Sequence, residues 1–158
     1  MIACRGDVKR ELATEISAEL NLPIGYNDAH VALPGILALQ APRFTSQANA
    51  SGEMEMLSNH LKGQNLEKFP LVLVVDDSKF TSATLNNYLW VAYTRANPSH
   101  DIYGIDSYVE HKHWGCRGSL IIDARIKPHH APELVQDSTV TKKVDKLFSK
   151  GGELYKFK

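Results

Sequence analysis

The run Leu71–Val75, with the sequence LVLVV, is followed directly by Asp76 and Asp77. It is the longest aliphatic run in the chain and is far too short to cross a bilayer. A strand that is apolar at every position is typical of a sheet with helices on both faces, because no side of the strand meets water. The run therefore predicts an α/β fold with 71–75 as an inner strand.

The segments on either side of this run alternate between helical and extended patterns. One helix pattern starts at Asp7, where Val8, Leu12, Ile16 and Leu20 recur every four positions behind an aspartate able to cap it. The predicted helices are 7–20, 46–61, 81–97 and 138–150, and the predicted strands are 36–40, 71–75, 101–106 and 119–123. Residues 22–34 read as short extended pieces. The order predicts a three-layer α/β/α sandwich around a mixed or mostly parallel sheet.

Composition agrees with a folded domain and excludes several classes of protein. Of 158 residues, 43% are hydrophobic and 23% charged, which argues against disorder. Eighteen basic residues balance 18 acidic ones, so the whole domain lacks the charge that binding to nucleic acid or an anionic membrane requires. We expect neither a nucleic acid nor a membrane as partner.

Length and the N-terminal sequence bound the domain organisation and the compartment. We expect a single α/β domain over 1–158, with a lead-in at 1–34, a core at 35–150 and a tail at 151–158. The first residues, MIACRGDVKRELATEI, place charges where a signal peptide would need an apolar run. Cys4 and Cys116 could form one disulfide at most. A soluble, reduced, cytoplasmic protein is expected.

The carboxylates of Asp76 and Asp77 follow the inner strand, where ligands of open α/β sheets gather. Two carboxylates there could hold a hard metal ion or act as acid and base. The structural alternative is that Asp77 or Ser78 organises the turn and caps the next helix. No second metal-binding or catalytic motif accompanies this acidic pair, which favours the structural alternative.

The stretch 111–118, HKHWGCRG, concentrates side chains able to bind metal or react. His111, His113 and Cys116 could hold zinc, with His129 or His130 as a fourth ligand. The spacing matches no established metal motif, so a loop with exposed, titratable histidines is the alternative. Cys116 could also serve as a nucleophile if a cation lowered its pKa, although no orienting group is evident.

Arg125 and Lys127 follow the predicted strand 119–123. Their cationic side chains could reach a phosphate or a carboxylate. Equally, Lys127 and Pro128 could simply lead the chain out of the sheet. The residues alone leave these two interpretations open.

Five segments resemble the C-terminal domain of UbiD-like decarboxylases, three of them consecutive along the chain. The segments FPLVLVVDD (69–77), YLWVAYTR (88–95) and NPSHD (97–101) are similar to the family's "VVVVDDD" strand and its "VLWALATR-DP" segment. GSLIIDARIK (118–127) is similar to the family's "GSKLGIDAT-K" segment, and 24–40 is similar to the entry into that domain. The resemblance covers most of the chain.

The resemblance implies part of a carboxy-lyase that decarboxylates aromatic or unsaturated acids on prenylated FMN, with a divalent metal and potassium at the cofactor phosphate. In that family the catalytic residues and metal ligands belong to a preceding split-barrel domain, which this sequence does not contain. The implied role is therefore assembly and oligomerisation: packing over a flavin-binding split-barrel domain or subunit, in a homo-oligomer. No catalytic residue and no tightly bound cofactor is expected in this chain alone.

This sequence departs from the family where the family carries cations. The family's lysines after the first strand correspond to 38–43, where Arg43 is the cation left to contact a phosphate. Leu120 and Arg125 replace the lysine and threonine of the "GSK" and "DAT" segments. Arg43, Arg125 and Lys127 are thus the residues expected to approach a ligand or a partner.

Two other hypotheses remain from the sequence. The chain could be a stand-alone binding or regulatory module that kept the fold without the chemistry. It could also be a zinc enzyme built on His111, His113 and Cys116.

Overall fold

The computed structural model describes residues 6–8, 10–130 and 137–157. Their contacts form two compact units, 1–128 and 129–158, and each unit is described by itself. The core that we predicted over 35–150 runs across the boundary between these units. That all 158 residues form a single domain stays a prediction.

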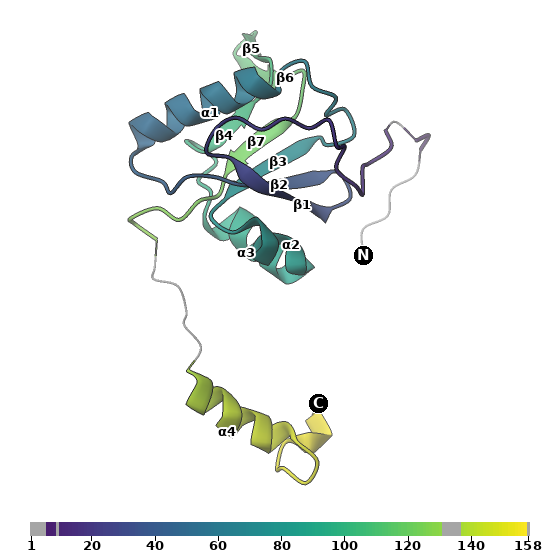
Figure 1. The fold of residues 1–158 in the computed structure, drawn as a ribbon, viewed down its shortest axis with the longest axis vertical. Helices are drawn as coiled ribbons and strands as arrows, with labels where there is room; N and C mark the ends of the chain where they lie inside the picture. Colours follow the sequence, from purple (N-terminus) through teal and green to yellow (C-terminus); the bar gives the residue numbers. More distant parts are fainter. Residues whose placement is uncertain (1–5, 9, 131–136, 158) are drawn as a thin grey trace. The chain divides into compact units, whose positions relative to one another are not determined.

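The first unit is built on a five-stranded mixed sheet with strand order β1-β2-β3-β7-β4 (Figure 1). Strands β2, β3 and β7 are parallel, and the two edge strands are antiparallel to their neighbours. The strands are β1 (Asn27–Leu33), β2 (Ile36–Gln40), β3 (Leu71–Val75), β4 (Ile102–Gly104) and β7 (Leu120–Asp123). The predicted inner strand therefore has the predicted bounds.

Helices cover both faces of this sheet, which confirms the three-layer α/β/α prediction (Figure 1). The helices of this unit are α1 (Gln47–Leu61), α2 (Ser78–Ala83) and α3 (Leu85–Thr94). In β3, Val72 and Val74 pack in the core cluster that includes the buried side of α1. Leu73 and Val75 pack on the other face with residues of α3. The all-apolar strand thus has no side that meets water.

The helix boundaries are set by side chains that accept hydrogen bonds from free backbone amides. Ser46 caps α1 by accepting from the Asn49 amide at 3.2 Å, close to where the sequence placed the helix start. The helix that we predicted over 81–97 is instead two helices. Asp77 caps α2, and Thr84 lies in extended conformation and caps α3, so it ends one helix and starts the next.

The predicted helix over 7–20 is wrong, because the described part of this segment contains no helix. Its backbone bonds elsewhere: the Ala13 amide donates to the Lys68 carbonyl at 3.0 Å, and the Gly35 amide donates to the Ala13 carbonyl at 2.8 Å. Ile16 and Leu20 still pack against the core. The apolar spacing therefore marked two partly buried positions, whereas Val8 and Leu12 are exposed. Tertiary backbone pairing overrode the local helical preference.

Strands β5 (Ser107–Glu110) and β6 (His113–Cys116) form a separate antiparallel hairpin within the stretch for which we predicted a loop. The two turn residues, His111 and Lys112, have φ of 49° and 67°. Two consecutive left-handed residues define the type I′ turn, which normally selects Asn-Gly. Histidine and lysine are unfavourable in this conformation, which explains why no hairpin signal is evident in the sequence.

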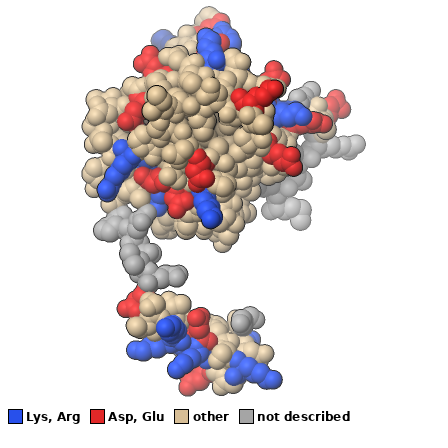
Figure 2. Space-filling model, in the orientation of Figure 1, with Lys and Arg blue, Asp and Glu red and all other residues tan. Residues whose placement is uncertain are grey.

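The second unit contains α4 (Ser138–Phe148) and a short 3₁₀ helix, η1 (Tyr155–Phe157). The helix begins at Ser138, but its cap is Asp137, whose Oδ1 accepts from the Thr139 amide at 2.7 Å. Figure 2 shows lysines and acids along this unit. Within the described ranges, no helix is long and apolar enough to span a membrane.

Replacing the turn of the β5–β6 hairpin by His111→Asn with Lys112→Gly should stabilise the first unit by about 1 kcal/mol, because both residues then suit positive φ. Denaturant unfolding followed by tryptophan fluorescence measures the gain. The matched control is Lys112→Ala, which keeps a Cβ at the same φ and should give no comparable gain. An equal gain in this control would contradict the argument.

The helix α4 should lose its first turn in acid. Hydrogen bonds from the hydroxyl and amide of Thr139, and then from the Val140 amide, hold the pKa of Asp137 below its ordinary value. The stabilisation is present above about pH 4, the ordinary range of an aspartate, and is lost as pH falls through the lowered pKa. Backbone ¹³C shifts of 138–141 against pH measure this loss. An Asp137→Ser variant, whose cap does not titrate, should show none; equal titration in both proteins would contradict it.

Candidate functional site

The parallel strands β2, β3 and β7 end at the same edge of the sheet, and the residues that follow them meet there. Side chains from this edge, from α1 and from the end of α3 form one set of ion pairs, which we call the carboxyl-edge network. Its members are Glu53, Asp76, Arg95, Asp101, Asp123, Arg125 and Lys127. It contains two of the three cations that the sequence singled out.

Arg125 is the centre of this network and is completely buried. Its Nε and Nη2 donate to the two carboxylate oxygens of Asp123, at 2.9 and 2.8 Å, in a bidentate pair. Its Nη1 donates to Glu53 Oε2 at 2.6 Å and to the Pro42 carbonyl at 2.8 Å. The guanidinium thus joins β7, α1 and the segment after β2.

The electrostatics of this centre favour the charged form of the arginine. Desolvation by burial works to lower the pKa of Arg125, but the hydrogen bonds and charges of Asp123 and Glu53 outweigh it and raise that pKa. The same environment acts on Tyr26, where burial, with smaller contributions from Glu53 and Asp123, raises the pKa to about 12. Both side chains therefore keep one protonation state around neutral pH, which suits a structural role.

Lys127 is also buried, and its ammonium group lies 3.2 Å from Asp101 Oδ2. Its Nζ also donates to the carbonyls of Asp123 at 2.8 Å and Arg95 at 3.1 Å. Asp101 is itself 1% exposed, and its Oδ1 has no hydrogen-bond partner within the described residues. Lys127 therefore ties the exit of β7 to the loop that follows α3.

Asp76 and Asp77 have structural roles in this arrangement. Asp76 Oδ2 accepts from the Ile126 amide at 2.7 Å and lies 3.6 Å from an Arg95 guanidinium nitrogen. Asp77 Oδ1 accepts from the Phe80 amide at 2.8 Å as the cap of α2. The two carboxylates act on separate backbone segments, in agreement with the structural alternative drawn from the sequence.

Arg43 is the exposed cation among the three predicted site residues. It belongs to the segment after β2, one residue beyond Pro42, whose carbonyl accepts from Arg125. The next residue, Phe44, lies with its ring 5.8 Å from the Arg125 guanidinium and 5.5 Å from Lys127 Nζ. The buried network therefore positions the segment that carries Arg43. Whether Arg43, Arg125 or Lys127 contacts a ligand stays a prediction.

The predicted histidine and cysteine site is not brought together. His111 is in the hairpin turn, and His113 and Cys116 stand three residues apart on β6, which places them on opposite faces of that strand. Across 6–8, 10–130 and 137–157, no group of three or more His, Cys, Asp or Glu side chains is placed to hold a metal. Burial raises the pKa of the Cys116 thiol, which disfavours the thiolate that a nucleophile requires.

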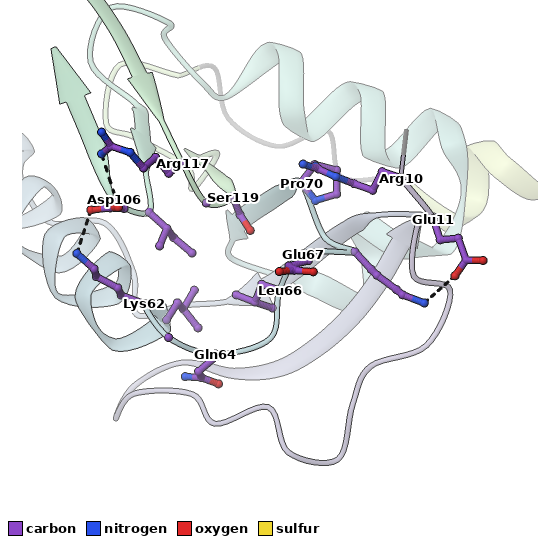
Figure 3. A pocket seen from close by; sticks show the side chains of 15 residues that line it. Arg10, Glu11, Lys62, Gln64, Leu66, Glu67, Pro70, Asp106, Arg117 and Ser119 are labelled. Carbon is purple, nitrogen blue, oxygen red and sulfur yellow. Dashed lines mark hydrogen bonds and ion pairs between the residues drawn. The ribbon is translucent and has the colours of Figure 1, made fainter. Parts of the chain in front are cut away.

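A hollow of about 690 Å³ lies at the opposite end of the parallel strands, next to Pro70 and Ser119 (Figure 3). Asp106 pairs there with Lys62 at 2.9 Å and Arg117 at 3.7 Å. The ion pair with Lys62 holds the pKa of Asp106 below its ordinary value. No local pattern in the sequence predicts this hollow, because its walls come from segments distant in the chain.

No family model matches this sequence. An uncharacterized protein of Chlamydia muridarum is 32% identical over 93 residues, which are 56% of this chain and 16% of that protein. An uncharacterized protein of Chlamydia caviae is 29% identical over 111 residues, which are 70% of this chain and 18% of that protein. A protein of Chlamydia pneumoniae, named as a subunit of 4-hydroxybenzoate decarboxylase, is 25% identical over 92 residues, covering 58% and 16%. The chain spans less than a fifth of the length of these relatives.

Among solved structures, the chain is similar to two of the vanillic acid decarboxylase of Sedimentibacter hydroxybenzoicus in open form. One has a TM-score of 0.46 and 20% identity, covering 77% of this chain and 27% of that chain. The other has a TM-score of 0.38 and 19% identity, covering 79% and 28%. The chain is thus distantly similar in sequence to a named decarboxylase subunit, and its own fold is α/β.

Removing the charge of Arg125 should destabilise the first unit severely. An Arg125→Met variant leaves Asp123 buried without its partner, which typically costs about 3–5 kcal/mol. Denaturant unfolding measures this loss. Arg117→Met is the matched control, because Arg117 pairs with Asp106 in an exposed position, where loss of the pair costs about 1 kcal/mol or less.

The double variant Arg125→Met with Asp123→Asn separates charge from packing. It should recover part of the stability lost in Arg125→Met, because no carboxylate then remains buried without a partner beside position 125. A double variant that is less stable than Arg125→Met would show that Asp123 and Arg125 stabilise this edge of the sheet by packing and not by neutralising each other's charge.

Proposed function

We propose that this chain is a domain or small subunit of a decarboxylase of the UbiD-like type, with a role in assembly rather than in the chemical step. The observation that carries this proposal is the similarity over 92 residues to the chlamydial protein named as a subunit of 4-hydroxybenzoate decarboxylase. The motif order from 69 to 127 supports it, since the same residues build β3, α3 and β7 here. The substrates would be aromatic or unsaturated carboxylic acids, and the compartment the cytoplasm.

The carboxyl-edge network supports an assembly role, because its charged groups bond to one another. Arg125 and Lys127 are 0% and 3% exposed and bond to Asp123, Glu53 and Asp101. A phosphate would have to compete with these carboxylates for the same cations. The described side chains therefore do not fit a complete site for the phosphate and metals of prenylated FMN. We infer that a flavin-binding split-barrel domain or subunit supplies that site.

Arg43 is the side chain best placed to complement such a partner. It is exposed, and its backbone segment is fixed by the bond from Arg125 to Pro42. An arginine held on a rigid segment suits bidentate contact with a phosphate or a carboxylate of the partner. This gives the chain one contribution to cofactor binding without a cofactor site of its own.

The test is reconstitution with a purified split-barrel flavin protein of the UbiD-like type. We expect co-elution of the two chains in size-exclusion chromatography, and release of carbon dioxide from 4-hydroxybenzoate or a related acid by the complex only. Arg43→Ala should lower flavin retention in the complex. Arg10→Ala, at the opposite end of the parallel strands, is the matched control and should leave it unchanged.

Three results would overturn this proposal. Turnover by the pure chain without a partner would place the chemistry in this chain. A folded chain that binds no flavin protein at any concentration would instead favour a stand-alone binding module that kept the fold without the chemistry. A stoichiometric metal lost in a His113→Ala variant would favour the zinc enzyme.

A further inference from the structure

The hollow next to Pro70 and Ser119 has an apolar floor (Figure 3). Leu61, Leu66 and Ile105 line it, and all three are buried because they also pack in the core cluster that includes α1. Gly118 allows the chain to close against this floor, since a Cβ there would lie only 2.8 Å from the Cβ of Ile105. The volume of about 690 Å³ lies within the roughly 300–1,000 Å³ that is typical of small-molecule sites.

The rim of this hollow carries more cations than carboxylates. Its charged lining residues are four cations, Arg10, Lys62, Lys68 and Arg117, and three carboxylates, Glu11, Glu67 and Asp106. Two of the cations share Asp106: one of its carboxylate oxygens lies 2.9 Å from Lys62 and the other 3.7 Å from Arg117. The side chains of these two cations are 60% and 65% exposed, whereas Arg125 and Lys127 at the other end of the strands are buried. A bound monoanion would therefore leave the hollow neutral.

Arg117 is the cation best placed to bind that anion. Its contact with Asp106, at 3.7 Å, is longer than a hydrogen bond, so the guanidinium keeps N–H donors for a ligand. Its guanidinium carbon lies 4.7 Å from the centre of the Tyr108 ring, and its backbone amide donates to the Asp106 carbonyl at 3.2 Å. These contacts position the side chain at the hollow before a ligand binds. A guanidinium can hold a carboxylate through two parallel hydrogen bonds.

We propose that this hollow binds a small organic acid, with the carboxylate between Lys62 and Arg117 and an apolar body on the floor formed by Leu61, Leu66 and Ile105. An anion without an apolar body would gain nothing from the floor, and a neutral apolar molecule would gain nothing from the two cations. The excess of one positive charge favours a monoanion over a phosphate dianion. This site is separate from the carboxyl-edge network and does not depend on the proposed role in a decarboxylase.

Titration of the ¹⁵N-labelled full chain with 3-phenylpropanoate, followed by amide chemical shifts, tests this site. We expect saturable shifts at the amides around the hollow, 62–68, 105–106 and 117–119, with a dissociation constant on the order of 1 mM. The neutral amide of the same acid keeps the apolar body, and acetate keeps only the carboxylate. Each should bind about tenfold more weakly or not at all.

The variant Arg117→Met should weaken the binding of 3-phenylpropanoate about tenfold or more, because the hydrogen bonds to the carboxylate are lost. The matched control is Lys112→Met, which removes a cation from the turn of the same hairpin, outside the hollow, and should leave the dissociation constant unchanged. Both residues are exposed, so both variants should fold, and their amide spectra check this.

Three results would contradict the inference: no saturable shift at these amides, equal affinity for the acid and its neutral amide, or wild-type affinity in Arg117→Met. None of them bears on the recruitment of a flavin protein, so the proposed function and this inference can fail separately.

Discussion

The bidentate pair between Arg125 and Asp123 is the interaction on which the carboxyl edge of the sheet depends. Both side chains are 0% exposed, and the arginine also bonds to Glu53 of α1 and to the carbonyl of Pro42. A guanidinium offers five donors in a fixed plane, and here four of its hydrogen bonds reach three separate segments. Lysine could not replace it, since an ammonium group has only three donors and no planar fork.

The same pair explains why this edge differs from the usual ligand-binding edge of an α/β sheet. Ligands of such sheets bind beyond the carboxyl ends of the strands, where loops leave cations and amides exposed. Here Asp123, Asp101 and Glu53 hold the cations in the interior, and Asp76 uses its carboxylate on the backbone of Ile126. A buried ion pair is weak support for stability in itself, but it fixes which segments meet. We therefore regard this edge as a structural element that holds β7, α1 and the segment carrying Arg43 together.

The sequence predicted the parts of the fold whose signals are local. Strand β3 has its predicted bounds because every residue in it is apolar, and α1 follows from Ser46 and the spacing of its buried residues. The segment 7–20 has the same apolar spacing, yet its backbone pairs with 35 and 68, which no local pattern encodes. The β5–β6 hairpin was missed because His111 and Lys112 are poor residues for a type I′ turn.

In the predicted site, too, local features could be predicted from the sequence and contacts between distant segments could not. Spacing placed Arg125 and Lys127 at the end of a strand, as observed, but it could not show that Asp101 and Glu53, from distant segments, would neutralise them. Helix α3 shows the opposite behaviour, because its apolar side chains Trp90 and Tyr93 remain 55% and 74% exposed. The cations of Arg125 and Lys127 are paired inside this unit, while apolar side chains of α3 remain exposed. Such a combination favours contact with another apolar surface over the binding of an ion, and it supports the assembly role proposed above.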